Sequence, residues 1–206
     1  MTDAQAATVQ AYDADAARYA AETRELPESV RRALDEIVGR LPSGARVLEI
    51  GSGGGRDAAY LEEHGLRVRR TDITPGFVAL LREQGHQADV LDPLTDDLAS
   101  PEGPYDAVWA SASLLHVART DLGTVLARLA EATRPGGLLR ISLKEGDGEA
   151  WSTHGAISAP RLFTYWREED LRRLADASGW VDVAVDHVMA GRTELQPWLE
   201  ITAVRA

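Results

Sequence analysis

Four glycines within five residues follow a short apolar run and form the part of this sequence best suited to bind a ligand. The run 46–50 leads directly into Gly51-Ser52-Gly53-Gly54-Gly55. Glycines at such a place let the chain turn sharply and let its backbone approach a ligand closely. The N–H groups at the start of the helix expected after them can stabilise an anion or a carboxylate. The pattern therefore predicts a ligand site at the end of a strand.

Two acids lie at informative distances from these glycines. Glu49 precedes Gly51 by two residues, and Asp72 follows it by 21, at the end of a second predicted strand. A carboxylate at that second place suits the two hydroxyls of a ribose. Arg56 stands where the dinucleotide fingerprint needs its third small residue, and the lone lysine, Lys144, leaves no phosphate-binding loop of the GK[ST] kind. The spacing favours a ribose-containing ligand other than a nucleoside triphosphate.

The composition excludes several classes of protein. The 206 residues carry 22 Lys and Arg against 33 Asp and Glu, a formal net charge of −11. A chain this acidic has no broad basic field, which argues against nucleic acid as a partner. The absence of Cys excludes disulfides, thiolate catalysis and iron–sulfur ligation. No apolar run approaches the ~20 residues that span a bilayer, and the first residues lack the features of a secretory signal. We therefore expect no membrane partner and a cytoplasmic location.

Strand and helix patterns alternate along the chain. We predict strands at 46–50, 67–71, 87–91, 107–110, 138–143, 181–188 and 199–204, and helices within 3–40 and at 56–64, 75–84, 121–133 and 167–178. This alternation predicts an α/β fold, with a doubly wound and mostly parallel sheet covered by helices on both faces. We interpret residues 1–206 as one domain, with an N-terminal helical cover at 1–42 over a core at 45–206.

The glycine-rich segment with its acid resembles a known family. Glu49, Gly51, Gly53 and Gly55, spaced as E-x-G-x-G-x-G, resemble motif I of the class I S-adenosylmethionine-dependent methyltransferases. The resemblance continues in the same order through Asp72, Asp92-Pro93-Leu94, Tyr105–Ala110 and Arg134–Leu138, and so covers about residues 45–145. The segments Gly55–Asp57, Ser113–His116 and Lys144–Gly146 resemble small stand-alone bacterial enzymes of the tellurite-resistance and small-molecule type.

This resemblance implies a fold, a cofactor and a reaction. The fold would be Rossmann-like, with seven strands and an antiparallel last strand. The cofactor would be S-adenosyl-L-methionine, leaving S-adenosyl-L-homocysteine after direct in-line transfer of its methyl group to an oxygen or nitrogen of a small-molecule acceptor, without a metal. The residues expected to bind the cofactor are Tyr12, Glu49, Gly51, Ser52, Gly53, Gly55, Asp72, Ile73, Asp92, Pro93, Leu94, Ala110 and Ser111. Glu49 has two open roles, as a buried acid that holds loop amides or as a contact to the cofactor's amino-acid end.

Three residues, His116, Lys144 and Tyr19, are candidates for catalysis, each with an alternative. His116 follows the fourth predicted strand, where parallel sheets place ligands, and its pKa class suits a general base; it could instead only shape the pocket. Lys144, at the end of the fifth strand, is either a charge presented to the acceptor or an exposed loop residue. Tyr12 and Tyr19, seven residues apart on one helix face, either pack in the core or form a lid whose phenols meet cofactor or acceptor. The aromatic segment 151–166 is either an acceptor-pocket insert or an ordinary loop.

Two other functions remain open from the sequence. One is an NAD(P)-dependent oxidoreductase, against which Arg56 and the lack of a Tyr-x-x-x-Lys pair argue. The other is a catalytically silent module that binds S-adenosylmethionine. Methylation of nucleic acid is disfavoured by the net charge and by Ala110-Ser111-Ala112-Ser113, which stands where an N-P-P-Y-type tetrapeptide would be expected. Methylation of a protein stays open, and so does the choice between monomer and homodimer.

Overall fold

The computed structural model of the chain describes residues 2–191 and 194–206. The helices are α1 (Asp3–Glu22), α2 (Glu28–Arg40), α3 (Arg56–Glu63), α4 (Pro75–Glu83), α5 (Leu122–Ala132) and α6 (Glu168–Ala177), with one 3₁₀ turn, η1 (Leu114–His116). The strands are β1 (Arg46–Ile50), β2 (Arg67–Asp72), β3 (Ala88–Val90), β4 (Tyr105–Ala110), β5 (Thr133–Glu145), β6 (Glu149–Ser152), β7 (Arg161–Trp166), β8 (Trp180–Ala190) and β9 (Gln196–Arg205). Within these ranges no helix is long and apolar enough to cross a membrane.

The sheet has the expected α/β topology. Strands β3, β2, β1, β4 and β5 are parallel neighbours in that order, and β9 pairs antiparallel with both β5 and β8. The last strand therefore enters antiparallel between β5 and β8, which confirms the predicted Rossmann-like fold class. Parallel strands end at one edge of a sheet, so the residues that follow β1, β2 and β4 are brought together there.

Among the described residues the sheet contains nine strands, two more than the seven expected. The two additional strands are β6 and β7, an antiparallel hairpin that accounts for most of the aromatic segment 151–166. The end of β7 extends the sheet, because Lys144 and Glu145 of β5 pair with Tyr165 and Trp166. Strands of four and six residues are too short for a two-residue period to stand out from the aromatic residues around them.

Both faces of the sheet are buried, as its parallel strands require. On one face Val108 of β4 packs with Leu126 and Leu129 of α5. On the other face Trp109, the next residue of β4, packs with Leu34 of α2. Helix α2 therefore covers one face of the sheet, whereas α1 lies on neither face.

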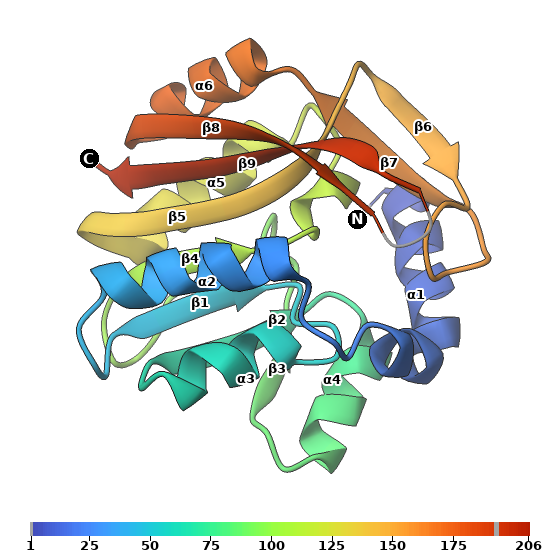
Figure 1. Cartoon of the computed structure of the whole chain (residues 1–206), viewed down its shortest axis with the longest axis horizontal. Coiled ribbons are helices and arrows are strands. Elements are labelled where there is room, and N and C mark those ends of the chain that lie inside the picture. Colours follow the sequence, from blue (N-terminus) through green and yellow to red (C-terminus); the bar gives the residue numbers. More distant parts are fainter. Residues whose placement is uncertain (1, 192–193) are drawn as a thin grey trace.

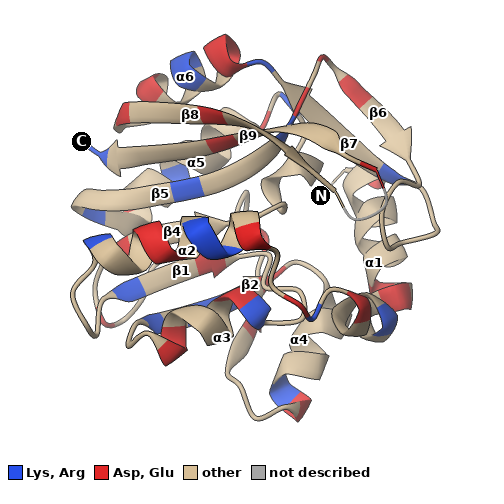
Figure 2. Cartoon of the chain, in the orientation of Figure 1, with Lys and Arg blue, Asp and Glu red and all other residues tan. Residues whose placement is uncertain are grey.

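Helix α1 lies across the edge at which the parallel strands end. Figure 1 shows it beyond the arrowhead of β1, beside α4 and the β6–β7 hairpin, and its contacts are with α4 and β7. Within the described residues 2–42, α1 lies at this edge and α2 packs on a face of the sheet. Figure 2 shows Arg interspersed with Asp and Glu along α2 and α6, so neither helix carries a run of charge of one sign.

Candidate active site

The glycine-rich loop between β1 and α3 requires glycine at its two ends. Gly51 has φ +82° and Gly55 has φ +81°, a region that side chains rarely adopt. A Cβ on Gly51 would overlap the side chain of Ser113, and a Cβ on Gly55 would lie 2.5 Å from the side chain of Leu81. The loop is tied to β2, because the N–H groups of Gly51 and Ser52 both donate to the carbonyl of Thr71 at 2.9 Å. The glycines thus let the loop run close to both neighbouring segments.

Asp72, at the end of β2, presents its carboxylate to this loop. One oxygen accepts the N–H of Gly53 at 2.9 Å and the other accepts the N–H of Thr74 at 2.8 Å. The side chain is only 6% exposed, and burial raises its pKa. Each carboxylate oxygen has a second lone pair, so Asp72 can still accept two hydroxyl hydrogens from a bound molecule. The geometry suits the vicinal diol of a ribose.

Glu49 lies behind the loop and outside the cavity. It is 2% exposed at the end of β1, and the hydroxyl of Ser52 donates to it. Burial, with the nearby charge of Asp57, raises the pKa of Glu49 to about 8. Glu49 therefore contacts the loop through the hydroxyl of Ser52.

A cavity opens between the loop, α1 and the segment after β4. Of the residues predicted for the site, those that line it are Tyr12, Tyr19, Gly51, Gly53, Asp72, Ile73, Pro93, Ser111 and His116. The predicted residues outside the lining are Glu49, Ser52, Gly55, Asp92, Leu94, Ala110 and Lys144. The lining residues that the sequence reasoning missed are Gln5, Thr8, Val9, Ile50, Thr74, Phe77, Leu91, Ala112, Ser113, Leu114 and Val117. Helical spacing back from Tyr12 could have found those on α1, whereas Phe77 has no local signal.

Helix α1 is fastened to the rim of the cavity through polar contacts with separate segments. Asp13 accepts the N–H of Gly76 at the start of α4 at 2.6 Å. Thr8 accepts the N–H of Leu162 in β7 at 3.1 Å. Gln5 donates to Asp92 after β3 at 3.3 Å. The helix therefore forms one wall of the cavity, and Asp92 is tied to it at the rim.

An aromatic cluster forms the inner side of α1. The rings of Tyr12 and Tyr19 are 5.5 Å apart in an edge-to-face arrangement, and both pack against Phe77 of α4. Tyr19 lies above Gly53 of the loop, and Tyr12 lies beside His116. The two tyrosines share a face as predicted, and that face is directed into the cavity.

His116 is held in one tautomer by its neighbours. Its Nδ1 lies 2.6 Å from the carbonyl of Leu162, and its Nε2 lies 3.0 Å from the hydroxyl of Tyr12. A carbonyl can only accept, so Nδ1 carries the hydrogen and Nε2 of the neutral ring accepts from Tyr12. Burial lowers the pKa of His116 to about 4, and the charges of Arg161 and Lys144 contribute. The imidazole is therefore neutral at physiological pH, with its lone pair toward the cavity.

Lys144 lies inside β5 and is 4% exposed, so the interpretation as an exposed loop residue was wrong. Its ammonium donates to the side chain of Gln196 and lies 4.6 Å from the ring centre of Phe163 and 5.4 Å from that of Trp198. Burial lowers its pKa, with a contribution from Arg161. The register pairs Lys144 with both Trp198 of β9 and Tyr165 of β7, which encloses it from two sides.

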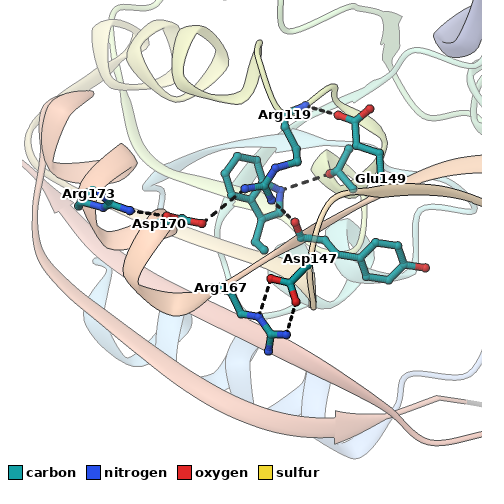
Figure 3. A network of polar contacts seen from close by, with 9 residues as sticks. Arg119, Asp147, Glu149, Arg167, Asp170 and Arg173 are labelled. Carbon is teal, nitrogen blue, oxygen red and sulfur yellow. Dashed lines mark hydrogen bonds and ion pairs between the residues drawn. The ribbon is translucent and has the colours of Figure 1, made fainter.

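The β6–β7 hairpin is fixed by Arg119, in the segment after η1 (Figure 3). The N–H of Arg119 donates to Glu149 of β6 at 2.7 Å, and its guanidinium donates to the carbonyl of Tyr165 and to Asp170 of α6. The guanidinium also lies 4.0 Å from the ring centre of Trp166. One side chain thus joins the hairpin, α6 and the segment before α5, and so holds β7 beside the cavity.

The described ranges contain no group of three or more His, Asp or Glu side chains placed to hold a metal ion.

Comparison with known proteins gives consistent matches. A family model described as a methyltransferase domain matches residues 21–185. The ubiquinone biosynthesis O-methyltransferase of Xylella fastidiosa is 36% identical over 176 residues, which are 80% of this chain and 71% of that protein. The S-adenosyl-L-methionine-dependent Diels-Alderase iccD of Talaromyces variabilis is 31% identical over 130 residues, which are 58% of this chain and 43% of that protein.

A solved structure matches over the whole chain. The 1,6-didemethyltoxoflavin-N1-methyltransferase of Burkholderia thailandensis, with 1,6-didemethyltoxoflavin and S-adenosylhomocysteine bound, superposes with a TM-score of 0.72 and 25% sequence identity. The match covers 100% of this chain and 92% of that one.

Proposed function

The chain belongs to the class I S-adenosylmethionine-dependent methyltransferases, and from this membership we propose that its cavity has a cofactor half around Asp72 and an acceptor half around His116. The chain is an enzyme that uses S-adenosylmethionine to methylate a small molecule. The proposal concerns which residues perform the two tasks.

The observation that carries the cofactor half is the carboxylate of Asp72, held by Gly53 and Thr74 with lone pairs remaining toward the cavity. We assign the ribose hydroxyls to it. A Cβ on Gly51 would overlap Ser113, so at this position the loop can have a backbone but no side chain. We assign the amino-acid end of the cofactor to this loop, with Glu49 and Ser52 keeping the loop in shape.

The adenine is assigned to the segment after β3. Leu91 and Pro93 line the cavity there, next to Ile73, and offer apolar surface to a flat ring. Asp92 accepts the N–H of Leu94 at 3.0 Å, which fixes this turn, and its other oxygen faces Gln5. The carboxylate of Asp92 can accept a hydrogen bond from the exocyclic amine of adenine when Gln5 no longer donates to it.

The acceptor half lies between His116, Tyr12 and the segment after β4, where Ser111 lines the cavity. When bound, S-adenosylmethionine supplies a methyl carbon on sulfur, which a lone pair of oxygen or nitrogen attacks in line while the carbon–sulfur bond breaks. Alignment of this kind lowers a barrier without a metal or a covalent intermediate. The Nε2 atom of His116 can accept the hydrogen of an acceptor hydroxyl in place of Tyr12, and so orient its oxygen. Tyr19, above Gly53, covers the reacting groups and excludes water.

The remaining features of the proposal concern partners and organisation. We propose a monomer or homodimer in the cytoplasm, with the whole chain as one domain. The net charge of −11, and the mixing of charges along α2 and α6 in Figure 2, support a small-molecule acceptor over a nucleic acid.

The test measures binding and turnover separately. Calorimetric titration with S-adenosylhomocysteine is expected to show one site, and titration with NADH none. S-adenosylmethionine with a tritium-labelled methyl group, offered with a panel of small phenols, catechols and nitrogen heterocycles, is expected to label an acceptor and release S-adenosylhomocysteine. If the titration detects binding of NADH and no binding of S-adenosylhomocysteine, the result would support an oxidoreductase. If the protein binds S-adenosylmethionine but transfers its methyl group to none of the acceptors tried, the result would support a non-methylating module.

A further inference from the structure

Four cationic side chains are buried in the part of the chain that the structure describes. Two of them have a carboxylate partner and two do not. Arg70 donates to Glu62 at 2.6 and 2.8 Å, and Arg140 pairs with Glu200. Arg161 and Lys144, which are 2% and 4% exposed, have no such partner: within residues 2–191 and 194–206 no carboxylate lies at ion-pair distance from either.

The environment of these two cations is aromatic and incompletely satisfied. Arg161 donates to the carbonyl of His154 at 2.6 Å, and its Nε is buried with no hydrogen-bond partner among the described residues. Its guanidinium lies 5.2 Å from the ring centre of Phe163, and the ammonium of Lys144 lies 4.6 Å from the same ring. Aromatic faces attract cations but supply no full counter-charge.

These cations adjoin the acceptor half of the cavity. Arg161 lies 5.5 Å from the ring centre of Tyr12, and Phe163 lies 4.8 Å from the ring of His116. Tyr12 and His116 line the cavity, and the two cations lie behind them, outside its lining. Tyr12 belongs to α1, so a movement of α1 that admits an acceptor also moves this ring away from Arg161. A molecule that enters against His116 therefore comes within reach of a buried, unpaired positive charge.

Burial of a charge without a partner opposes folding and is found where the charge has another use. We propose that Arg161 and Lys144 form the binding site for an oxyanion of the methyl acceptor, which is therefore a small anionic molecule with an apolar body. This inference rests on the proposed function, because it names the acceptor class of the same site. The apolar body follows from the aromatic side chains around the site, among them Phe163, Tyr12 and Phe77.

An anionic acceptor also fits the state of His116. A histidine that stays neutral to about pH 4 is a poor proton acceptor for an ordinary alcohol. Two nearby cations stabilise the deprotonated form of an acidic group, so an acceptor bound beside them keeps its negative charge without a general base. Burial is the main reason that His116 is a weak base, and the two cations, which add to that effect, make a base unnecessary.

The test compares acids with their neutral amides on the protein saturated with S-adenosylhomocysteine. The probes are benzoate with benzamide, salicylate with salicylamide, and phenylacetate with phenylacetamide, because each pair differs in charge but hardly in shape. We expect at least one acid to bind about tenfold or more tightly than its amide, as charge-assisted hydrogen bonds imply. In Arg161→Met and Lys144→Met this preference should disappear. Equal affinities, or no binding by any acid, overturn the proposal.

The melting temperature separates a binding role from a structural one. Lys144→Met removes an unpaired buried charge and should leave the melting temperature of the ligand-free protein unchanged or raised. Arg140→Met is the matched control: it leaves Glu200 without its partner, and should lower the melting temperature. If Lys144→Met is destabilised as much as Arg140→Met and still prefers acids, the cations are structural and the proposal is wrong.

Binding of S-adenosylhomocysteine, measured in the same samples, keeps the two proposals apart. If the wild-type protein does not bind S-adenosylhomocysteine, the proposed function is contradicted. Its retention, with no preference for acids, would contradict only the assignment of Arg161 and Lys144.

Discussion

The hydroxyl of Tyr12 lies 3.0 Å from Nε2 of His116, although 104 residues separate them in the chain. This contact joins the covering helix α1 to the segment after β4, and it occupies the nitrogen that faces the cavity. An acceptor that hydrogen-bonds to His116 must take the place of Tyr12. The contact therefore links the position of α1 to the readiness of the acceptor half.

The tautomer of His116 is the first prediction. The carbonyl of Leu162 requires the hydrogen on Nδ1, and burial keeps the ring neutral, so nitrogen-15 spectra should show a protonated Nδ1 and a bare Nε2 at pH 6. His187, whose pKa is raised above its usual value by hydrogen bonds to Glu168 and Glu145, serves as the internal control and should be the imidazolium at pH 6. An imidazolium at position 116 at pH 6, or a hydrogen on Nε2, would contradict the arrangement.

The same group predicts the response of stability to acid. The pKa of His116 is about 4 in the folded chain and about 6.5 in the unfolded one, so the unfolded state binds more protons between these values. Stability is therefore lost as pH falls from about 6.5 to 4, by up to about 1.4 kcal/mol per pH unit. In His116→Gln the free energy of unfolding, measured with urea, should fall less over this window. Parallel curves for the two proteins would contradict the prediction.

Glu49 predicts a pH dependence of stability of the opposite sign, at higher pH. Burial raises its pKa to about 8, whereas the unfolded value is near 4.5, so the folded state holds the proton over this range. The contribution of Glu49 to stability therefore declines as pH rises from about 4.5 to 8. Glu49→Gln keeps an acceptor for Ser52 without a titrating group, so its stability relative to the wild type should increase across that window. A difference that stays constant with pH would show that Glu49 is ionised in the folded protein.

The glycine-rich loop predicts a contrast between two glycines. Gly51→Ala forces a side chain into a left-handed conformation and against Ser113, so it should cost at least about 2 kcal/mol and abolish binding of S-adenosylhomocysteine. Gly39, near the end of α2, has open space around it, so Gly39→Ala should stabilise by about 0.5–1 kcal/mol and leave binding intact. Equal effects of the two substitutions would remove the case for a special loop geometry.

Asp72 predicts a loss of affinity. Each of its hydrogen bonds to a ribose hydroxyl is worth about 1.5–3 kcal/mol as a charged bond, so Asp72→Ala should weaken binding of S-adenosylhomocysteine at least ~10-fold in calorimetry. Asp89→Ala, an exposed acid of β3 that pairs with Arg69, is the control and should bind normally. Unchanged affinity in Asp72→Ala would remove the ribose assignment.

The sequence predicted the parts of the site that depend on local conformation. The turn after β1 needs positive φ at Gly51 and Gly55, and that need is visible in the residues themselves. Asp72 followed from its distance to the loop, because strand–helix–strand units have nearly constant length. The alternation of strands and helices predicted the doubly wound α/β fold class.

Features that depend on contacts between distant segments could not be predicted. The pairing of Tyr12 with His116, the entry of Phe77 into the lining and the enclosure of Lys144 by Trp198 each require the packed molecule. Arg161 stood in a segment that looked equally like a loop, because its hairpin is short and is held by Arg119 from elsewhere in the chain. Its burial could not be read from its type, since Arg is mostly exposed in proteins.

A crystal structure with S-adenosylhomocysteine tests the central claim most directly. The account predicts both ribose hydroxyls within hydrogen-bond distance of Asp72, the amino-acid end of the ligand against the loop from Gly51 to Gly53, and its sulfur toward the space beside Tyr12 and His116. A ligand bound elsewhere, or a ribose without contact to Asp72, would contradict it.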